Sequence, residues 1–262
     1  MFNHFFLATL TLPLLGHAAY FDQQQKPLQD YKPDVVVSLK LDDQLHYSFD
    51  PISTGVRAGS LEALQSDYDN ALPDPIRTVT IDIPIDASIS GSVVFSHIQD
   101  QSGSRDPGSS VWFFSGGRNS YIPLNDVGIR KGGMIGMPAV GASLTLETPH
   151  IHLPAGIFAI LLQATHTSSE QDFVADCGSL DIFPDLVFGL RPRDMEDEEE
   201  REEIVVTPEQ YIMRTEADKC LLLVRSAEER ANGRGDASLG WAAIRGKSFV
   251  FDRSRHRMGF AQ

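Results

Sequence analysis

The chain has 262 residues, of which 42% are hydrophobic, and it carries 36 acidic and 22 basic side chains for a formal net charge of −14. This length and hydrophobic content can bury a substantial core in one large domain or two lobes, which excludes disorder of the whole chain. The acidic excess argues against nucleic acid or an anionic membrane as a partner.

The N-terminus has the composition of a secretory signal peptide. An apolar stretch over residues 5–15 is followed by small residues that end at Ala19. The stretch is too short to cross a bilayer, which needs ~20 apolar residues, so we expect a signal peptide over residues 1–18 and no membrane anchor. The mature protein is then expected in the secretory pathway, secreted or vacuolar.

Strand patterns dominate the chain after this segment. Apolar residues alternate over residues 35–41 and again over 45–49, which predicts two half-buried strands. Residues 78–95 alternate in the same way around a break at 86–91, which predicts a hairpin. Pro84 weakens the first strand of this hairpin or marks it as a sheet edge, because proline donates no ladder hydrogen bond.

Helical patterns are few. Residues 154–164 begin with proline and carry apolar side chains at helical spacing, which predicts a short buried helix. A further helical turn is predicted at residues 207–211. The acidic run at 194–203 has the composition of a solvated loop, and a calcium or cationic-partner site is the alternative, although no ligand spacing is evident. The predicted class is mostly β.

Cys177 and Cys220 are the two cysteines of the chain. In a secreted protein, two cysteines favour one disulfide, which would stabilise the fold by ~3–4 kcal/mol in the chain-entropy model. A free reactive thiol is the alternative.

Three blocks near the C-terminus follow one another in a distinctive order. The first contains Cys177 and FPDLVF at residues 183–188, the second runs from Val206 through PEQYI to Cys220, and the third is SLGWAAIRGKSFVFDRSRHRMGFA at residues 238–261. In order and spacing they resemble the C-terminal lobe of the pepsin-like aspartic proteases, peptidase family A1. The corresponding family patterns are a strand like LPDIVF, a PxxYI stretch before a half-cystine, and ILGDxFLRxYYxVFDxxxxxIGFA.

The resemblance implies a mostly β, pepsin-like acid-protease fold. It implies a near-complete C-terminal lobe over residues 108–262 and a reduced N-terminal lobe over residues 19–107. It also places Cys177 and Cys220 where the family has a disulfide. Trp241 departs from the pattern, because the family has an acidic residue after Leu-Gly.

Upstream segments resemble the family more weakly. VWFFSGGRN at residues 111–119 resembles the entry to the second lobe, and IPIDASISGSV at residues 83–93 resembles the flap hairpin, with Pro84 in place of the flap tyrosine. The strand that ends in Phe49 and Asp50 resembles the strand that delivers the first catalytic aspartate.

The catalytic chemistry of this family needs two carboxylates, one per lobe, that share a proton and hold a water. Each aspartate needs a following Thr/Ser-Gly turn, whose hydroxyl and amide hydrogen-bond the carboxylate and whose glycine allows close packing. Neither D-T-G nor D-S-G occurs in the sequence.

Asp50 and Glu147 are the candidate catalytic residues. Asp50 is followed by Pro51, and Glu147 is followed by Thr148 and Pro149, so proline replaces the expected turn residues. A glutamate also carries an extra methylene, and ~1 Å of misplacement can cost ~10²-fold in rate. Exposed strand ends explain both acidic residues equally well.

Two hypotheses of different class follow. In the first, Asp50 and Glu147 form a distorted dyad that hydrolyses peptides at acidic pH. In the second, which we prefer, a remnant cleft binds a peptide or protein without cutting it. The sequence also runs almost directly from Phe95 to Arg105, where the family has most of its remaining first lobe, so an incomplete gene model is a third possibility.

Other chemistry has weaker support. His150 and His152 could place two imidazoles on one strand face for a metal, but no third ligand is evident at suitable spacing. No nucleophile elbow is present, and the glycines at 132–141 follow Lys131 rather than preceding a lysine, unlike a phosphate loop. We expect no cofactor and no metal, and the sequence leaves the oligomeric state open.

Overall fold

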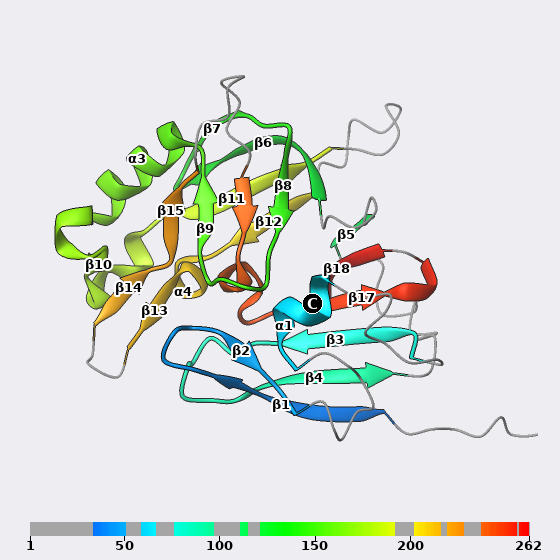
Figure 1. Cartoon of the computed structure of the whole chain (residues 1–262). Coiled ribbons are helices and arrows are strands. Elements are labelled where there is room, and N and C mark those ends of the chain that lie inside the picture. The colour runs from blue at the N-terminus through cyan, green and yellow to red at the C-terminus, as the bar shows by residue number, and fades with distance from the viewer. Residues whose placement is uncertain are drawn as a thin grey trace, which may run out of the picture. The chain divides into compact units, whose positions relative to one another are not determined.

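The computed structural model describes residues 34–50, 59–66, 76–96, 111–114, 121–191, 202–215, 219–227, 237–255 and 257–261 (Figure 1). The predicted signal peptide, the expected lobe boundary at 107/108 and most of the acidic run lie outside these residues, so all three stay predictions. Within the described ranges, no helix has the length and apolar character needed to cross a membrane.

The described part of the chain is mostly strand, as predicted. Its strands are β1 (Val35–Leu41), β2 (Tyr47–Ser48), β3 (Thr78–Asp82), β4 (Gly91–Ser96), β5 (Val111–Phe114), β6 (Tyr121–Arg130), β7 (Met134–Pro138), β8 (Gly141–Leu144), β9 (Ile151–Leu153), β10 (Val174–Ala175), β11 (Asp185–Leu190), β12 (Glu203–Val206), β13 (Ile212–Arg214), β14 (Cys220–Leu222), β15 (Val224–Ser226), β16 (Ala237–Leu239), β17 (Ser248–Asp252) and β18 (Arg257–Ala261). The α-helices are α1 (Leu61–Ser66), α3 (Ala155–Thr165) and α4 (Pro208–Tyr211), and the 3-10 helices are η1 (Ser169–Gln171), η2 (Cys177–Ile182), η3 (Trp241–Ile244) and η4 (Arg253–Arg255).

A seven-stranded sheet combines both ends of the described chain, in the order β2-β1-β4-β3-β17-β18-β5 (Figure 1). The C-terminal hairpin of β17 and β18 pairs with β3 on one side and with β5 on the other. The alternating apolar residues of the hairpin are buried as predicted, and Phe249 makes edge-to-face contacts with Phe251 and Phe260. N-terminal and C-terminal segments therefore share one core.

The hairpin of β3 and β4 confirms the predicted strand pair but corrects two interpretations of it. β3 lies inside the sheet, between β4 and β17, and ends at Asp82, so Pro84 falls beyond the ladder and does not mark an edge. The turn is also anchored, because the Gly246 amide donates to the Ile83 carbonyl at 2.7 Å. The two strands of the hairpin are thus interior to the sheet, whereas residues 85–90 of its turn are exposed.

The eight-stranded sheet has the order β12-β11-β6-β8-β16-β9-β15, and β7 pairs with the second half of β6. β16 runs parallel to β8, and β15 runs parallel to β9. The predicted helix is α3, which follows Pro154 and packs on β6, β7 and β15 with Ile157 and Leu161 buried. This sheet carries the segment that contains Glu147.

A small sheet of β10, β14 and β13 lies next to the predicted disulfide. Cys177 at the start of η2 is bonded to Cys220 at the start of β14, with 5.4 Å between their Cα atoms. This separation is ordinary for a disulfide, and the prediction is confirmed.

Candidate active site

Asp50 lies two residues after β2 and is exposed. Tyr47 and Phe49 are buried on the core side, and the Phe49 amide donates to the Gly59 carbonyl at 2.9 Å. The same alternation turns Asp50 to solvent. The strand ends at Ser48, slightly before the predicted end, and the Asp50 carboxylate lies outside the core.

Glu147 lies in the turn between β8 and β9 and is also exposed. This turn is held from both sides. The Thr145 amide donates to the Leu239 carbonyl at 2.9 Å, and the Leu146 amide donates to the Gln65 side-chain oxygen at 2.6 Å. The backbone around Glu147 is thus fixed, whereas its carboxylate faces water.

Thr148 occupies the position whose hydroxyl would hydrogen-bond a catalytic carboxylate. Its Oγ1 instead lies 3.0 Å from Nδ1 of His150 and accepts the His150 amide at 3.2 Å. The next residue, Pro149, is buried and has no amide to donate. The Thr148 hydroxyl is therefore directed to His150 and not to Glu147, and Pro149 supplies no amide to Glu147.

Gly240 packs directly on this turn. A Cβ at position 240 would lie 2.5 Å from the carbonyl carbon of Pro149, so only glycine fits there. Gly240 therefore allows a close backbone approach to Pro149, the proline at the position of the expected turn glycine.

Trp241 joins the two candidate segments. Its side chain is fully buried, its indole N–H donates to the Leu45 carbonyl at 3.0 Å, and its backbone amide donates to the Thr148 carbonyl at 2.9 Å. Its ring meets Tyr47 edge to face, with 5.1 Å between the ring centroids. The residue that departs most from the family pattern is therefore a packed bridge between the β1–β2 hairpin and the turn of Glu147.

Gln65 on α1 forms a second bridge that the sequence did not reveal. Its Nε2 donates to the Leu144 carbonyl at 2.6 Å, and its Oε1 accepts the Leu146 amide. A glutamine on a short helix carries no signal of such a role. Trp241 thus ties the β1–β2 hairpin to the turn of Glu147, and Gln65 ties α1 to the same turn. The carboxylates of Asp50 and Glu147 are both exposed to solvent. Solvent screens the electrostatic interaction between two carboxylates that sharing a proton requires.

His150 and His152 lie near each other, with 6.4 Å between ring centroids. Burial, the nearby Arg225 and the neighbouring His152 lower the pKa of His150 to about 4, and burial with Arg225 also lowers the pKa of His152. The Nδ1 atom of His152 is 2.8 Å from the hydroxyl of Ser238. Among the described residues, no group of three His, Cys, Asp or Glu side chains could hold a metal ion.

Residues 139–262 match the family model described as eukaryotic aspartyl protease. Similar solved structures include conglutin gamma, a basic 7S globulin from lupine seeds, with a TM-score of 0.49, 17% identity, and coverage of 79% of this chain and 55% of that one. Another is basic 7S globulin from soybean, with a TM-score of 0.47, 13% identity, and coverage of 79% and 57% respectively. The chain therefore spans little more than half the length of these two proteins.

No curated protein sequence matches the chain. The family match contains Glu147, both cysteines and all three C-terminal blocks that resemble the family. Over residues 139–262, the chain is related to the eukaryotic aspartyl proteases, the pepsin-like family that its C-terminal blocks resemble.

Proposed function

We propose that this protein is a secreted, non-catalytic relative of the aspartic proteases that binds a peptide or protein beside the segments of Asp50 and Glu147 without cutting it. The observation that carries the proposal is the Thr148 hydroxyl, which is engaged by His150 and not by a carboxylate. A carboxylate without its orienting hydroxyl and amide cannot be held within the ~1 Å that such catalysis tolerates.

The first candidate carboxylate has a matching defect. Asp50 is exposed and is followed in the sequence by Pro51, which has no amide to donate. Two carboxylates that share a proton need close contact and a low-dielectric site. We therefore infer that neither Asp50 nor Glu147 meets the requirement for a catalytic carboxylate.

The binding part of the proposal rests on what the chain retains. Trp241 connects the β1–β2 hairpin to the turn of Glu147, and Gln65 connects α1 to the same turn. In the family, a substrate peptide lies extended between two such segments. A bound peptide would need only this rigid support, because rigid sites avoid the entropy cost of ordering on binding.

Secretion is supported by two independent features. The N-terminal stretch has the pattern of a signal peptide, and Cys177 is bonded to Cys220. Structural disulfides persist in oxidising compartments and are rare in the cytosol.

A binding experiment tests the proposal. The mature protein is immobilised and exposed to peptides from a denatured protein, and the retained peptides are identified and sized by mass spectrometry. Retention of intact peptides is expected, and it should survive the double change Asp50→Asn and Glu147→Gln. Gln65→Ala should weaken retention by releasing the turn of Glu147, whereas Gln163→Ala on the exposed side of α3 should not.

Two results would decide against the proposal. Failure to retain any peptide would remove the binding function. Shortened peptides that become intact in the double variant would establish the alternative, an active Asp50 and Glu147 dyad.

A further inference from the structure

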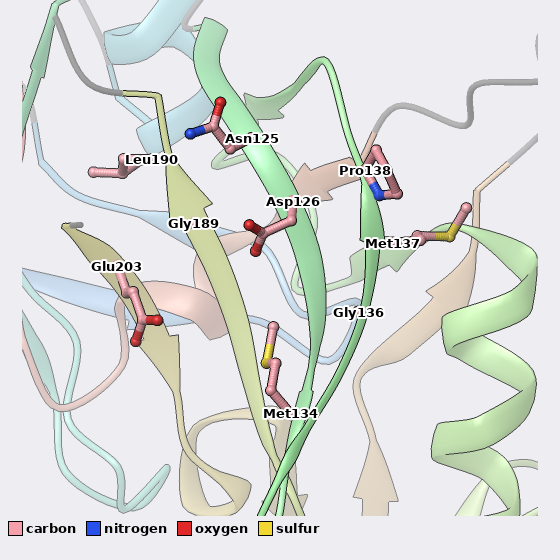
Figure 2. A pocket seen from close by; sticks show the side chains of 9 residues that line it. All are labelled: Asn125, Asp126, Met134, Gly136, Met137, Pro138, Gly189, Leu190 and Glu203. Atoms are coloured by element: carbon pink, nitrogen blue, oxygen red, sulfur yellow. The ribbon is translucent and has the colours of Figure 1, made fainter. Parts of the chain in front are cut away.

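A pocket of about 420 Å³ lies at the four adjacent strands β7, β6, β11 and β12, and neither Asp50 nor Glu147 lines it (Figure 2). It is independent of the proposed peptide-binding surface. Its lining includes two acidic residues, Asp126 and Glu203, together with Gly189, Gly136 and Met134.

The strand register explains how the acidic residues meet. Asp126 on β6 pairs with Gly189 on β11, and Gly189 pairs with Glu203 on β12. Residues directly opposite each other in antiparallel strands point to the same face of a sheet. The two carboxylates therefore stand on one face, two strand spacings or roughly 10 Å apart, with Gly189 between them. Figure 2 shows the Asp126 carboxylate turned toward β11 at Gly189.

The floor of the pocket is bare backbone. A Cβ at Gly189 would lie 2.7 Å from Oδ1 of Asp126, so a side chain there would displace the carboxylate. Gly128 and Gly136 pair across β6 and β7, and a Cβ at Gly128 would lie 2.7 Å from the terminal methyl of Met134. The thioether side chain of Met134 thus lies over a glycine surface at the edge of the pocket.

The charges in this pocket do not balance. Glu203 accepts a 2.7 Å hydrogen bond from the guanidinium of Arg130. Within the described ranges, the half-buried Asp126 has neither a hydrogen bond nor an ion pair through its carboxylate. Among the described residues that line the pocket, Asp126 and Glu203 are the charged ones, and of these Glu203 is the one paired with a base.

We propose that this pocket binds an alkylammonium group, either the side chain of a lysine in a peptide or a free aliphatic diamine. The ammonium would lie between Asp126 and Glu203, and its methylene chain would lie over the glycine floor beside Met134. Methionine adapts well to an alkyl chain. The inference goes beyond the proposed function and does not depend on it.

The chemistry favours this ligand over other cations. Calcium takes six to eight oxygen ligands, but the described residues hold no group of three acidic or other metal-ligating side chains. Arg130 already occupies one of the two carboxylates, that of Glu203. Asp126 remains as a single anion, which suits the compact point charge of an ammonium.

The test uses the full mature protein and three small probes. Isothermal titration compares Nα-acetyl-lysine-N-methylamide with its uncharged isostere Nα-acetyl-norleucine-N-methylamide, and 1,5-diaminopentane represents the free amine. We expect the lysine derivative or the diamine to bind about tenfold more tightly than the norleucine derivative, because a charge-assisted hydrogen bond is added. This difference should shrink as salt rises. The two amines then show which source the pocket accepts.

Substitutions connect the binding to the pocket. Asp126→Asn should remove the charge preference at nearly constant shape, whereas Asp181→Asn, at an exposed site on η2, should retain it. Gly189→Ala provides a second variant should Asp126→Asn fold poorly, and it should also weaken binding. Binding of both amines no tighter than that of the norleucine derivative, no binding by either amine, or unchanged binding in a folded Asp126 or Gly189 variant would overturn the proposal.

Discussion

Trp241 stands where the pepsin-like family pattern has an acidic residue after Leu-Gly. A charged side chain would be costly in this environment, whereas the indole is fully buried and satisfied by the Leu45 carbonyl at 3.0 Å. The family position is thus used here for packing between two segments.

The first prediction follows from this bridge. Trp241→Phe keeps an aromatic ring but leaves the Leu45 carbonyl without its donor, so the free energy of unfolding should fall by about 1–3 kcal/mol. Trp241→Ala should cost more, about 3–5 kcal/mol, because it also creates a cavity. Urea denaturation measures both values. A Phe variant as stable as the wild type would show that the hydrogen bond contributes nothing.

The second prediction concerns pH and His150. The pKa of His150 falls to about 4 on folding, so its contribution to stability is complete above its ordinary value near 6.5 and is lost as pH decreases toward 4. The unfolded chain takes up the proton first in this window. The side chain is only partly buried, so solvent screening reduces the loss to about 1 kcal/mol. Denaturation curves between these pH values should show it.

A matched pair of histidine variants isolates this effect. His150→Gln should flatten the pH dependence, whereas His166→Asn should keep it, because His166 is exposed at the end of α3. His166 has a positive φ of 53°, a conformation that asparagine tolerates. An unchanged pH profile in the His150 variant would assign the dependence to other groups.

The sequence predicted individual residues unevenly. It offered exposed strand ends for Asp50 and Glu147, and both side chains are exposed, because strand alternation is a local signal. It could not show that the Thr148 hydroxyl turns to His150, because side-chain rotation leaves no trace in residue order. The pair of Asp126 and Glu203 was also missed, since only the register of three strands brings them together.

Arg245 connects elements that are distant in the sequence. Its buried guanidinium donates to the carbonyls of Gln210 at 2.8 Å and Ile212 at 3.2 Å, and also to the carbonyl of Ile85 in the turn after β3. Burial lowers the pKa of Arg245 to about 10, which leaves it charged at neutral pH. One side chain therefore anchors the β3–β4 hairpin to the segment of α4 and β13.

The third prediction tests this anchor. Arg245→Met leaves buried carbonyls without donors and should lower the free energy of unfolding by ~3 kcal/mol. Amide hydrogen exchange should become faster over residues 83–90 than elsewhere in the same sheet. Arg245→Lys should restore part of the protection, because it keeps a charged donor without the guanidinium fork. Uniform exchange across the sheet in the Met variant would contradict a local anchoring role.

At the level of elements, local sequence patterns predicted which segments form strands and helices, but they did not predict which strands pair with each other. The alternation over residues 78–95 and the proline before α3 predicted real elements. Alternation does not say which strand lies alongside, so the pairing of Asp82 with Ser248 was not foreseen, and β3 was taken for an edge or a flap. Long-range pairing depends on the whole fold and leaves no local pattern.

At the scale of the whole molecule, the fold and the proposed loss of catalysis rest on different observations. The described core, the disulfide and the family match over residues 139–262 support the pepsin-like fold. The proposal that catalysis is lost rests on the exposed Glu147 carboxylate, the Thr148 to His150 hydrogen bond and the buried Pro149. Because the pKa of His150 is lowered to about 4, the free energy of unfolding should also fall at acidic pH, the range in which we considered peptide hydrolysis.

The most direct test of this account is an activity measurement on the mature secreted protein. It is incubated with a denatured protein substrate from mildly to strongly acidic pH, with Asp50→Ala and Glu147→Ala variants in parallel, and products are followed by mass spectrometry. We predict no cleavage above that of the variants and no tight binding of a statine-type transition-state inhibitor. Cleavage that the inhibitor blocks and that either substitution abolishes would show that Asp50 and Glu147 form a working dyad, contrary to this account.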